Sequence, residues 1–566
     1  MPSEFSHKTR VLNLSKLSQE IFDLLIIGGG ITGASTARDA AMRGLKVALV
    51  EKHDFAFGTS SRSSKLIHGG LRYLENMEFK LVFEALAERF LLLKTVPHMV
   101  RPLSFFMPIY KTGKSKWLIT LGMWLYDILA LFRATGFHKW LNKKKTSQKY
   151  PFLNPEGLLG GFQYYDASMN DDLLVLEILR SAHTLGVTSV NYVEAIKPLK
   201  TGERITGFIV RDRENSENEI SVRAHQVVVC AGPWTDMVGK LTGKSWKNWL
   251  KPSKGVHFLF DLKKISVNEA VVMNDPTNGR ISFVIPRPDF GTGMALVGTT
   301  DGPTPANPEK AVVEKSDVDY LMGLLHRYFP HLQLKTSDII SAYVGVRPLF
   351  GHLDEFDKND AKSLQKVSRE HHIGKGLGGT VVVVGGKYTT HRTMAAEIVD
   401  ESIAAWQEAH HHGEAPVLPN VTEAHTKDPI NPEATFEATR QARQKAKAEK
   451  ADIPEKLWSH HGAEAYALYQ IFKEKGEPLP DVPGFPWLAT QLRFAIRHEM
   501  TIHLADFYFR RSSLYATRVD QGLPFAETLA QVWAEELGYA PDKIPAELAR
   551  LHQAIDAASE WKKIFE

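Results

Sequence analysis

A glycine-rich turn near the N-terminus constrains the fold of this chain more than any other feature. The apolar run 23–27 is typical of a buried parallel strand. It leads directly into Gly28, Gly30 and Gly33, at the spacing Gly-x-Gly-x-x-Gly. Gly28 permits a tight turn, Gly30 lets the backbone approach a pyrophosphate, and Gly33 lets the next helix pack closely on the strand. The pyrophosphate would lie at the positive end of that helix.

The residues after the turn complete a strand–helix–strand unit. Residues 31–43 are rich in alanine and predict a helix that Gly44 ends, and residues 46–51 predict a second strand. Glu51 ends this strand at the place expected for a carboxylate that accepts hydrogen bonds from a ribose. The unit therefore predicts dinucleotide binding. The motif alone does not separate NAD from FAD, but its position at the N-terminus, with strands that return after residue 225, favours FAD.

The length of 566 residues predicts two or three domains. Strand candidates at 226–230, 281–286, 294–298 and 380–385 indicate a large α/β domain that a β-rich domain interrupts. We expect the dinucleotide-binding domain, within 20–405, to comprise about 20–110, 160–250 and 350–405. The other expected parts are a β-rich substrate domain at about 250–350, an apolar segment with basic flanks at 111–145, a linker at 405–435 and an all-helical C-terminal domain at 435–566.

A second motif follows Glu51 in the segment 58–75, which is dense in glycine and serine. Its hydroxyl and N–H groups can hold phosphate and ring oxygens, and its paired glycines can lie flat against a ring. Together with 227–234, 254–257, 283–286, 298–301, 345–349 and 385–392, this segment resembles the FAD-dependent (aerobic-type) glycerol-3-phosphate dehydrogenase family. The resemblance covers about residues 20–400 and continues weakly through 498–511. One departure is His391, where the family pattern has a tyrosine.

The resemblance implies a Rossmann-like FAD-binding domain of the glutathione-reductase/amine-oxidase-like superfamily, a β-rich substrate domain and an all-α C-terminal cap. It implies FAD as the cofactor and no metal. The run His410–His412 is interpreted as part of a solvated linker. The residues implied to bind FAD are Gly28, Gly30, Ile31, Thr32, Gly33, Glu51, Thr59, Ser60, Ser61, Ser63, Ser64, Lys65, Leu66, His68, Val193, Gly232, Gly386, Lys387, Thr389 and Thr390.

The same resemblance implies oxidation of sn-glycerol 3-phosphate to dihydroxyacetone phosphate, with hydride transfer to flavin N5 and a membrane quinone as the final electron acceptor. The substrate phosphate needs a cationic pocket, for which the candidates are Arg72, Tyr73, Arg347 and Lys387, since a guanidinium fork meets phosphate oxygens in pairs. Lys387 is also a candidate for assisting the flavin. Histidine is the natural base at neutral pH.

Two histidines compete for the role of base. His257 is preferred because it lies on a strand of the expected substrate domain, and His68 is the alternative in the flavin-proximal loop. Arg347 is a further catalytic candidate, because it can stabilise the developing alkoxide.

The segment 117–132 is apolar and aromatic, with lysines and arginines on both sides. Asp127 and its short length argue against a spanning helix. Pattern alone leaves two alternatives, a buried core helix and burial in the interface of an anionic membrane. The resemblance to a quinone-reducing family favours the second. With a single cysteine, Cys230, and no secretory signal in residues 1–20, we expect a cytoplasmic protein attached to the inner face of the cell membrane.

Three competing functions remain open at this point. One is a glycerol-3-phosphate oxidase that uses oxygen, and another is an amine or 2-hydroxy-acid oxidase of the same superfamily, which would not need several cations around a phosphate. The third is a non-catalytic flavin-binding protein whose helical C-terminal region binds a partner. The formal net charge of +4 is too small to indicate nucleic-acid binding, and a homodimer is one assembly that the resemblance allows.

Overall fold

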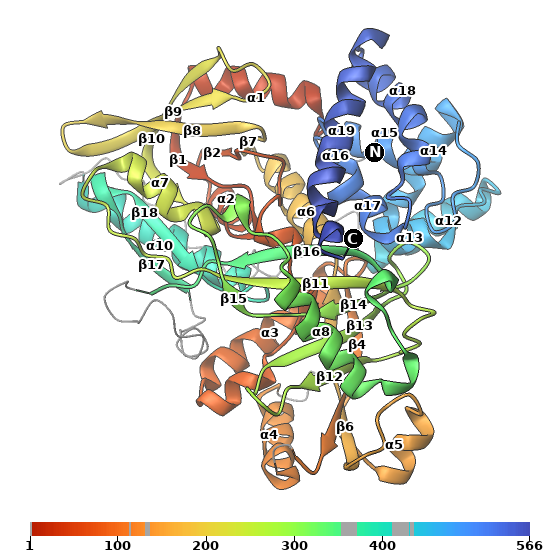
Figure 1. Ribbon diagram of the computed structural model, residues 1–566. Helices are drawn as coiled ribbons and strands as arrows, with labels where there is room; N and C mark the ends of the chain where they lie inside the picture. Colours follow the sequence, from red (N-terminus) through yellow and green to blue (C-terminus); the bar gives the residue numbers. More distant parts are fainter. Residues whose placement is uncertain are drawn as a thin grey trace.

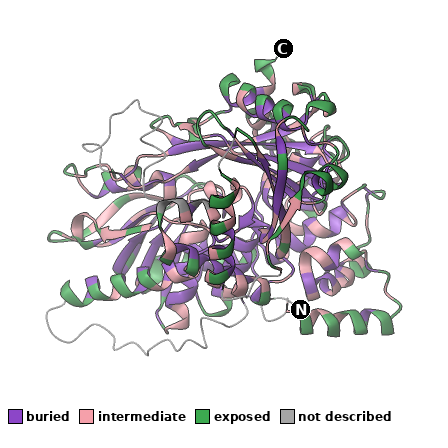
Figure 2. Cartoon of the chain, turned by 90° about the horizontal axis from the view of Figure 1, so that it is seen from below, coloured by how far each residue is buried: buried purple, intermediate pink, exposed green. Residues whose placement is uncertain are grey.

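Two β-sheets and a separate group of helices make up the fold (Figure 1). The computed structural model describes residues 3–112, 115–130, 136–351, 371–409, 430 and 435–565. Most of the expected linker, including His410–His412, therefore lies outside the described residues. Figure 2 shows that the strands are largely buried, whereas exposed positions gather on the outer helices and hairpins.

The first sheet contains the strand that leads into the glycine turn. β1 pairs in parallel with β2 and with β10, and β10 pairs in parallel with β18, as expected for a sheet of α/β type. In spatial order its strands are β17 (His371–Lys375), β18 (Val381–Gly385), β10 (Glu219–Val229), β1 (Ile21–Ile27), β2 (Val47–Val50) and β7 (Thr188–Val190), with β9 (Arg204–Asp212) and β8 (Val193–Thr201) added beyond β10.

Helices cover one face of this sheet because small side chains let them approach closely. α2 (Ile31–Met42) packs between α6 (Asp171–Thr184) and α10 (His391–Ala409). Ala34, Ala37 and Ala40 of α2 are fully buried in the core that these three helices share with the sheet. On the other face, α1 (His7–Gln19) buries Leu17 against β1 and β10. The polar residues 1–20 thus include a helix that the sequence pattern did not reveal.

The second sheet is larger and mostly antiparallel. Its core lies between the sheet and helix α8 (Lys315–Tyr328). In spatial order its strands are β15 (Gly302–Pro303), β11 (Ser253–Asp261), β14 (Met294–Gly298), β13 (Ile281–Arg287), β12 (Ala270–Asn274), β4 (Val100–Tyr110), β6 (Leu158–Met169) and β3 (Leu66–Ile67), with β16 (Ile339–Arg347) on β11 and β5 (Lys139–Asn142) on β6.

This sheet corrects two of the expected domain boundaries. Residues 100–110 and 160–169 were assigned to the dinucleotide-binding domain, but they form β4 and β6 of the second sheet. β4 also pairs in parallel with β12, so β4 and β6 belong to the same sheet as residues 270–274. The sheet of the substrate domain therefore includes strands from both sides of the apolar segment, because hydrogen bonds between residues far apart in the sequence determine which strands belong to it.

Most of the remaining helices of the first 250 residues connect strands of the second sheet. η2 (Leu71–Asn76) and α3 (Phe79–Thr95) follow the serine-rich segment, and α7 (Thr235–Thr242) follows β10. α4 (Lys116–Leu129) and α5 (Lys143–Lys149) lie at the same end of the molecule, at the bottom of Figure 1. Both fall within the apolar segment or its basic flank.

The C-terminal region is helical, as predicted, and has a hydrophobic core of its own. Among the described residues its main helices are α12 (Phe436–Ala448), α13 (Glu455–His461), α14 (Ala465–Lys475), α15 (Leu488–His498), α16 (Leu504–Asp506), α17 (Leu514–Thr517), α18 (Ala526–Leu537) and α19 (Ile544–Ser559).

A buried ionic cluster joins this C-terminal domain to the loop that follows β2. Asp54 is fully buried and accepts hydrogen bonds from the guanidinium groups of Arg510 and Arg511. Burial by itself raises the pKa of Asp54, but Arg511 and Arg510 outweigh it and hold that pKa below its ordinary value. The C-terminal domain is thus attached to a loop of the first sheet by charge as well as by packing.

A buried histidine adds an ionic link between the C-terminal domain and the loop between β9 and β10. His503 lies between Glu214 at 3.1 Å and Glu547 at 3.0 Å. Burial alone lowers the pKa of His503, but hydrogen bonds to the two carboxylates outweigh burial and raise it to about 9. His503 is therefore charged at neutral pH.

Candidate functional site

The glycine turn has the geometry that its sequence predicts. Gly28 adopts a φ of +115°, and a Cβ there would lie 2.4 Å from the carbonyl oxygen of Cys230. A Cβ on Gly33 would lie 1.9 Å from the carbonyl oxygen of Gly28, so only glycine lets α2 approach β1 this closely. The turn leaves the start of α2 open to a cavity of about 460 Å³.

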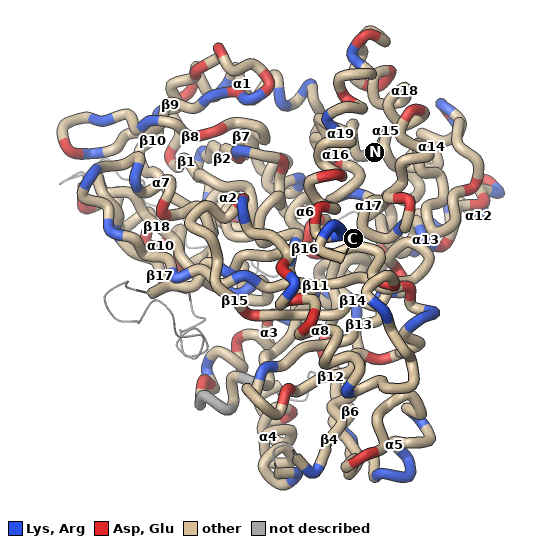
Figure 3. Tube along the Cα trace, viewed as in Figure 1, with Lys and Arg blue, Asp and Glu red and all other residues tan. Residues whose placement is uncertain are grey.

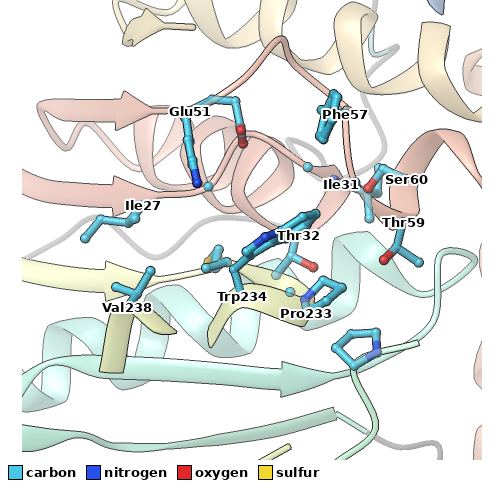
Figure 4. A pocket seen from close by; sticks show the side chains of 18 of the residues that line it. Ile27, Ile31, Thr32, Glu51, Phe57, Thr59, Ser60, Pro233, Trp234 and Val238 are labelled. Carbon is cyan, nitrogen blue, oxygen red and sulfur yellow. Dashed lines mark hydrogen bonds between the residues drawn. The ribbon is translucent and has the colours of Figure 1, made fainter. Parts of the chain in front are cut away.

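This first cavity is formed by segments far apart in the sequence. Figure 4 shows Glu51, Thr59 and Trp234 around the same space, from the end of β2, the serine-rich segment and the turn after β10. The predicted cofactor residues that line it are Gly28, Gly30, Ile31, Thr32, Glu51, Thr59, Ser60, Ser63, Val193, Gly232, Gly386 and Lys387.

Glu51 lies where a ribose-binding carboxylate is expected. Its Oε2 accepts a hydrogen bond from the N–H of Gly29 (2.7 Å), and its Oε1 accepts one from the N–H of His53 (2.9 Å). Burial raises the pKa of Glu51, although these N–H groups and Lys52 counteract it. The carboxylate is therefore held at the cavity wall by the backbone of the glycine turn and by that of the segment after β2.

Hydroxyl groups fix the serine-rich segment against α2 and the second sheet. Ser60 Oγ accepts a hydrogen bond from the N–H of Ile31 (2.9 Å), and Thr59 Oγ1 donates to the carbonyl oxygen of Val346. Ser61 Oγ donates to the carbonyl oxygen of Gly58 (3.3 Å) and does not line the cavity. The segment thus closes one side of the first cavity at the start of the helix.

The side chain of Lys65, one of the predicted cofactor residues, points away from both cavities. Lys65 is buried, and its ammonium group forms an ion pair with Asp171 at the start of α6. The same carboxylate group accepts from Ser63 Oγ at 2.6 Å. Lys65 lines neither cavity, because the buried carboxylate attracts the ammonium away from both. Gly33 and Thr390 are likewise behind the walls.

A second cavity of about 900 Å³ adjoins the first one. Ser63, Lys387 and Tyr388 line both, so the two spaces meet at these residues. The second cavity has a polar part and an apolar part. The polar part includes Ser64, His68, Asp166, Asn274, Arg280, Thr299, Thr300, Asp301, Arg347 and Thr389, and the apolar part includes Leu66, Leu71, Leu74, Met77, Phe105, Met107, Leu118, Ile119, Leu121 and Leu125.

Three of the predicted substrate residues lie on the second cavity. Arg347 is held by Asp301 Oδ1 (3.3 Å from Nη1) and by Thr299 Oγ1 (3.0 Å from Nη2). The ammonium group of Lys387 lies 3.6 Å from the centre of the Tyr73 ring, a cation–π contact. The side chain of Arg72 lies outside what the structure describes. The second cavity therefore combines at least two cations, and one of them, Lys387, lies where it meets the first cavity.

The two candidate bases occupy different positions. His68 lines the second cavity, and its backbone N–H donates to Thr389 Oγ1 (3.3 Å), which fixes it against the last glycine turn. His257 is buried behind Ser64: its Nε2 lies 2.8 Å from Ser64 Oγ, and its ring stacks on Tyr343. The structure therefore places His68 on the wall of the second cavity and His257 behind Ser64.

Burial keeps His257 neutral. Its buried position, together with Arg347 and Lys65, lowers the pKa of His257 to about 3. His391, where the resemblance predicts a tyrosine, is also buried; its Nδ1 lies 2.8 Å from Ser35 Oγ, and burial lowers its pKa to about 3. This residue ties α10 to α2 and lies on neither cavity wall. Both histidines support the walls from behind.

Sequence reasoning missed several residues of the walls. Asp166, Asn274 and Arg280 contribute polar groups to the second cavity. Asp166 lies on β6 and Asn274 ends β12, and neither residue has a glycine beside it. The available signal was a polar side chain at a strand position otherwise dominated by apolar residues. Among the described residues, no cluster of histidines, cysteines and carboxylates has the arrangement of a metal site.

The fold and the two adjoining cavities define an FAD-dependent oxidoreductase. The family model described as FAD dependent oxidoreductase matches residues 23–408, and the model of the C-terminal domain of alpha-glycerophosphate oxidase matches residues 381–544. The glycine turn, the open start of α2 and Glu51 fit the cofactor, and FAD is the cofactor of this chain.

Similar proteins identify the family of this chain more precisely. It is 33% identical over 553 residues to the aerobic glycerol-3-phosphate dehydrogenase of Staphylococcus saprophyticus, with 96% of each chain covered. It is 33% identical to the glycerol-3-phosphate dehydrogenase of Mycobacterium leprae, with 98% and 92% covered. The glycerol-3-phosphate dehydrogenase of Bacillus halodurans, solved with FAD, superimposes with a TM-score of 0.77 at 27% identity, covering 98% of both chains. The chain belongs to the FAD-dependent glycerol-3-phosphate dehydrogenase family.

Proposed function

We propose that this protein oxidises sn-glycerol 3-phosphate to dihydroxyacetone phosphate on FAD and passes the electrons to a membrane quinone. The observation that carries the proposal is the junction of the two cavities. There Lys387 borders both the FAD cavity and a second space that also contains Arg347 and His68. A small phosphorylated alcohol in the polar part of the second cavity would therefore have cations for its phosphate and a base for its hydroxyl group.

The cations suit a phosphate monoester, whose charge at neutral pH is about −1.5 to −2. Arg347 has a guanidinium plane already oriented by Asp301 and Thr299, so little side-chain freedom is lost when a phosphate or a developing alkoxide binds. Lys387 supplies a compact charge, which Tyr73 supports through its ring. An amine or 2-hydroxy-acid oxidase would not need several cations around a phosphate.

His68 takes the hydroxyl proton in this proposal. Bound FAD supplies the acceptor for the hydride that leaves the same carbon. His68 has the side-chain type whose ordinary pKa suits a base at neutral pH, and its backbone is fixed by Thr389. Loss of one hydride to FAD and one proton to His68 converts the secondary alcohol to the ketone. Arg347 stabilises the negative charge that develops on the oxygen.

The proposed quinone acceptor is supported by the apolar part of the second cavity. Leu118, Leu121 and Leu125 of α4 line it. The same helix exposes a second set of large apolar side chains to the surroundings: Trp117 is 77% exposed, and Trp124 is 55% exposed. α4 is therefore not a buried core helix. Among the residues that the structure describes, no helix is long and apolar enough to cross a bilayer.

We place this end of the molecule on the inner face of the cell membrane. Figure 3 shows lysines on α5 at the end where α4 projects, and these include Lys143, Lys144, Lys145 and Lys149. Exposed apolar side chains next to lysines favour the interface of an anionic membrane. Peripheral attachment would bring the apolar part of the cavity close to lipid-dissolved quinone.

Oxygen is the alternative acceptor, and a turnover experiment separates the two. Purified protein on anionic vesicles receives glycerol 3-phosphate with a short-chain quinone, and peroxide and reduced quinone are both quantified. The proposal expects dihydroxyacetone phosphate and reduced quinone in equal amounts, with little peroxide in air. Stoichiometric peroxide and no quinone reduction would establish an oxidase. No product with either acceptor would favour the non-catalytic flavin-binding protein.

A further inference from the structure

Helix α4 connects the exposed apolar surface to the interior of the protein. Its inner side carries Tyr126, which is 3% exposed, and Asp127, which is 5% exposed. Asp127 Oδ2 accepts from the N–H of His138 (3.2 Å) and contacts its Nδ1 (2.7 Å), so it fixes the helix to the segment before β5. Tyr126 points in the other direction, toward the loop that carries His68.

The hydroxyl group of Tyr126 is part of a buried hydrogen-bond cluster. It donates to the carboxylate of Asp166, with distances of 2.8 and 3.0 Å to Oδ1 and Oδ2. Arg89 on α3 forms an ion pair with the same carboxylate. The backbone N–H of Gly69 lies 3.0 Å from Tyr126 Oη and 3.2 Å from Asp166 Oδ1. Burial and Asp166 raise the pKa of Tyr126 well above its ordinary value, so its hydroxyl group stays protonated.

Gly69 is the residue directly after His68. A Cβ on Gly69 would lie 2.5 Å from Tyr126 Oη and 2.4 Å from Leu86 Cδ2, so the loop touches α4 and α3 without space between them. Tyr126 also packs in one apolar cluster with Tyr73. One side chain of α4 therefore contacts Gly69 and shares an apolar cluster with Tyr73, on either side of the loop in sequence.

We propose that Tyr126 and Asp166 are positioning residues that make the place of His68 in the second cavity depend on the position of helix α4. Their hydrogen bonds act on the N–H of Gly69, and through one peptide unit they set the backbone of His68. The inference rests on the proposed function, in which His68 is the base. Since a displacement of about 1 Å in a reacting group can cost about a hundredfold in rate, a small shift of α4 changes turnover without changing FAD binding.

The direct test is Tyr126→Phe, with Tyr110→Phe as a matched control. Tyr110, at the end of β4, donates a partly buried hydroxyl hydrogen bond to the carbonyl oxygen of Asn154 (3.1 Å) and lines neither cavity. Stopped flow measures how fast glycerol 3-phosphate bleaches the flavin under anaerobic conditions, as a function of pH. We expect Tyr126→Phe to slow bleaching about tenfold and to shift its pH profile, while KM, FAD content and the control stay close to wild type.

Equal effects of the two substitutions, or an unshifted pH profile for Tyr126→Phe, would overturn the inference. If glycerol 3-phosphate fails to bleach the wild-type flavin, the proposed function is wrong, which is a distinct outcome. Gly69→Ala is the second variant, because it retains the hydroxyl group and the carboxylate but forces the loop away from α4. It should slow bleaching by a similar factor, and normal bleaching by a flavin-loaded Gly69→Ala protein would also contradict the proposal.

Lipid binding tests the link to α4 itself. Anionic vesicles that hold the outer side of α4 should change the bleaching rate of the wild type. Tyr126→Phe should bind the same vesicles, because its substitution is buried, yet respond to them several times less. If vesicles change the bleaching rate equally in both proteins, the position of α4 does not affect His68 through Tyr126.

Discussion

Replacing Asp54 by asparagine should reveal how much the C-terminal domain contributes to the FAD cavity. Asp54 is completely buried between Arg510 and Arg511, so the substitution removes the negative charge that pairs with both buried guanidinium groups. Removing one partner of a buried ion pair costs about 3–5 kcal/mol. Arg510 keeps Asp506, and Arg511 keeps the carbonyl oxygen of Glu499, so we expect the lower end, about 3 kcal/mol.

The loop that Asp54 anchors also lines the first cavity through His53, Phe57 and Gly58. Urea unfolding of the flavin-loaded protein, followed by tryptophan and flavin fluorescence, should therefore show earlier flavin release as well as lower stability in Asp54→Asn. The matched control is Glu219→Gln, whose partner Arg211 is 42% exposed, and it should cost at most about 1 kcal/mol.

The effect of Asp54→Asn should depend on pH in one direction. The pKa of Asp54 is lowered in the folded protein. Its contribution is therefore complete above the unfolded pKa of about 3.9 and is lost as the pH falls further through the native pKa. If Asp54→Asn is no less stable than Glu219→Gln at pH 7, or if the difference grows toward low pH, the ionic account of this junction is wrong.

Three further predictions concern other parts of the molecule. Arg347→Lys should lower kcat/KM for glycerol 3-phosphate by about tenfold to a hundredfold in steady-state assays, because hydrogen bonds to charged groups are worth about 1.5–3 kcal/mol. If the variant prefers glycerol 3-phosphate over glycerol as strongly as the wild type does, Arg347 is not part of the phosphate site. Replacing Trp117, Leu121 and Trp124 by serine should release the protein from anionic vesicles with its flavin retained. If the variant loses its flavin instead, α4 has a structural role. The pKa of His503 is raised to about 9, so its stabilising effect is complete below about pH 6.5 and is lost as the pH rises through 9. The melting temperature should fall from pH 7 to pH 9.5, and a fall of equal size in His503→Gln would contradict this.

The sequence allowed prediction of the features that depend on local backbone geometry. The turn at Gly28 needs a positive φ, and the close packing at Gly33 excludes any Cβ, so glycines at these positions specify the strand–turn–helix unit by themselves. Glu51 follows from the length of the helix between the two strands. The helical C-terminal region was predictable because no strand-like run interrupts it.

Long-range pairing decided the features that the sequence did not reveal. β4 and β6 have ordinary strand patterns, and only their hydrogen bonds to each other and to β12 assign them to the second sheet. Lys65 lies within the motif segment, yet Asp171, more than a hundred residues away, determines where its ammonium group points. His257 lies on a predicted strand, but only the folded chain places Ser64 between it and the cavity.

Anaerobic addition of glycerol 3-phosphate to the purified protein tests the central claim most directly. The absorbance of the bound flavin near its visible maximum is followed with glycerol 3-phosphate, with glycerol, and with glycerol plus inorganic phosphate. The account predicts complete bleaching by glycerol 3-phosphate alone, with one equivalent of dihydroxyacetone phosphate for each flavin. A flavin that stays oxidised with glycerol 3-phosphate, or that is bleached equally well by glycerol, would contradict it.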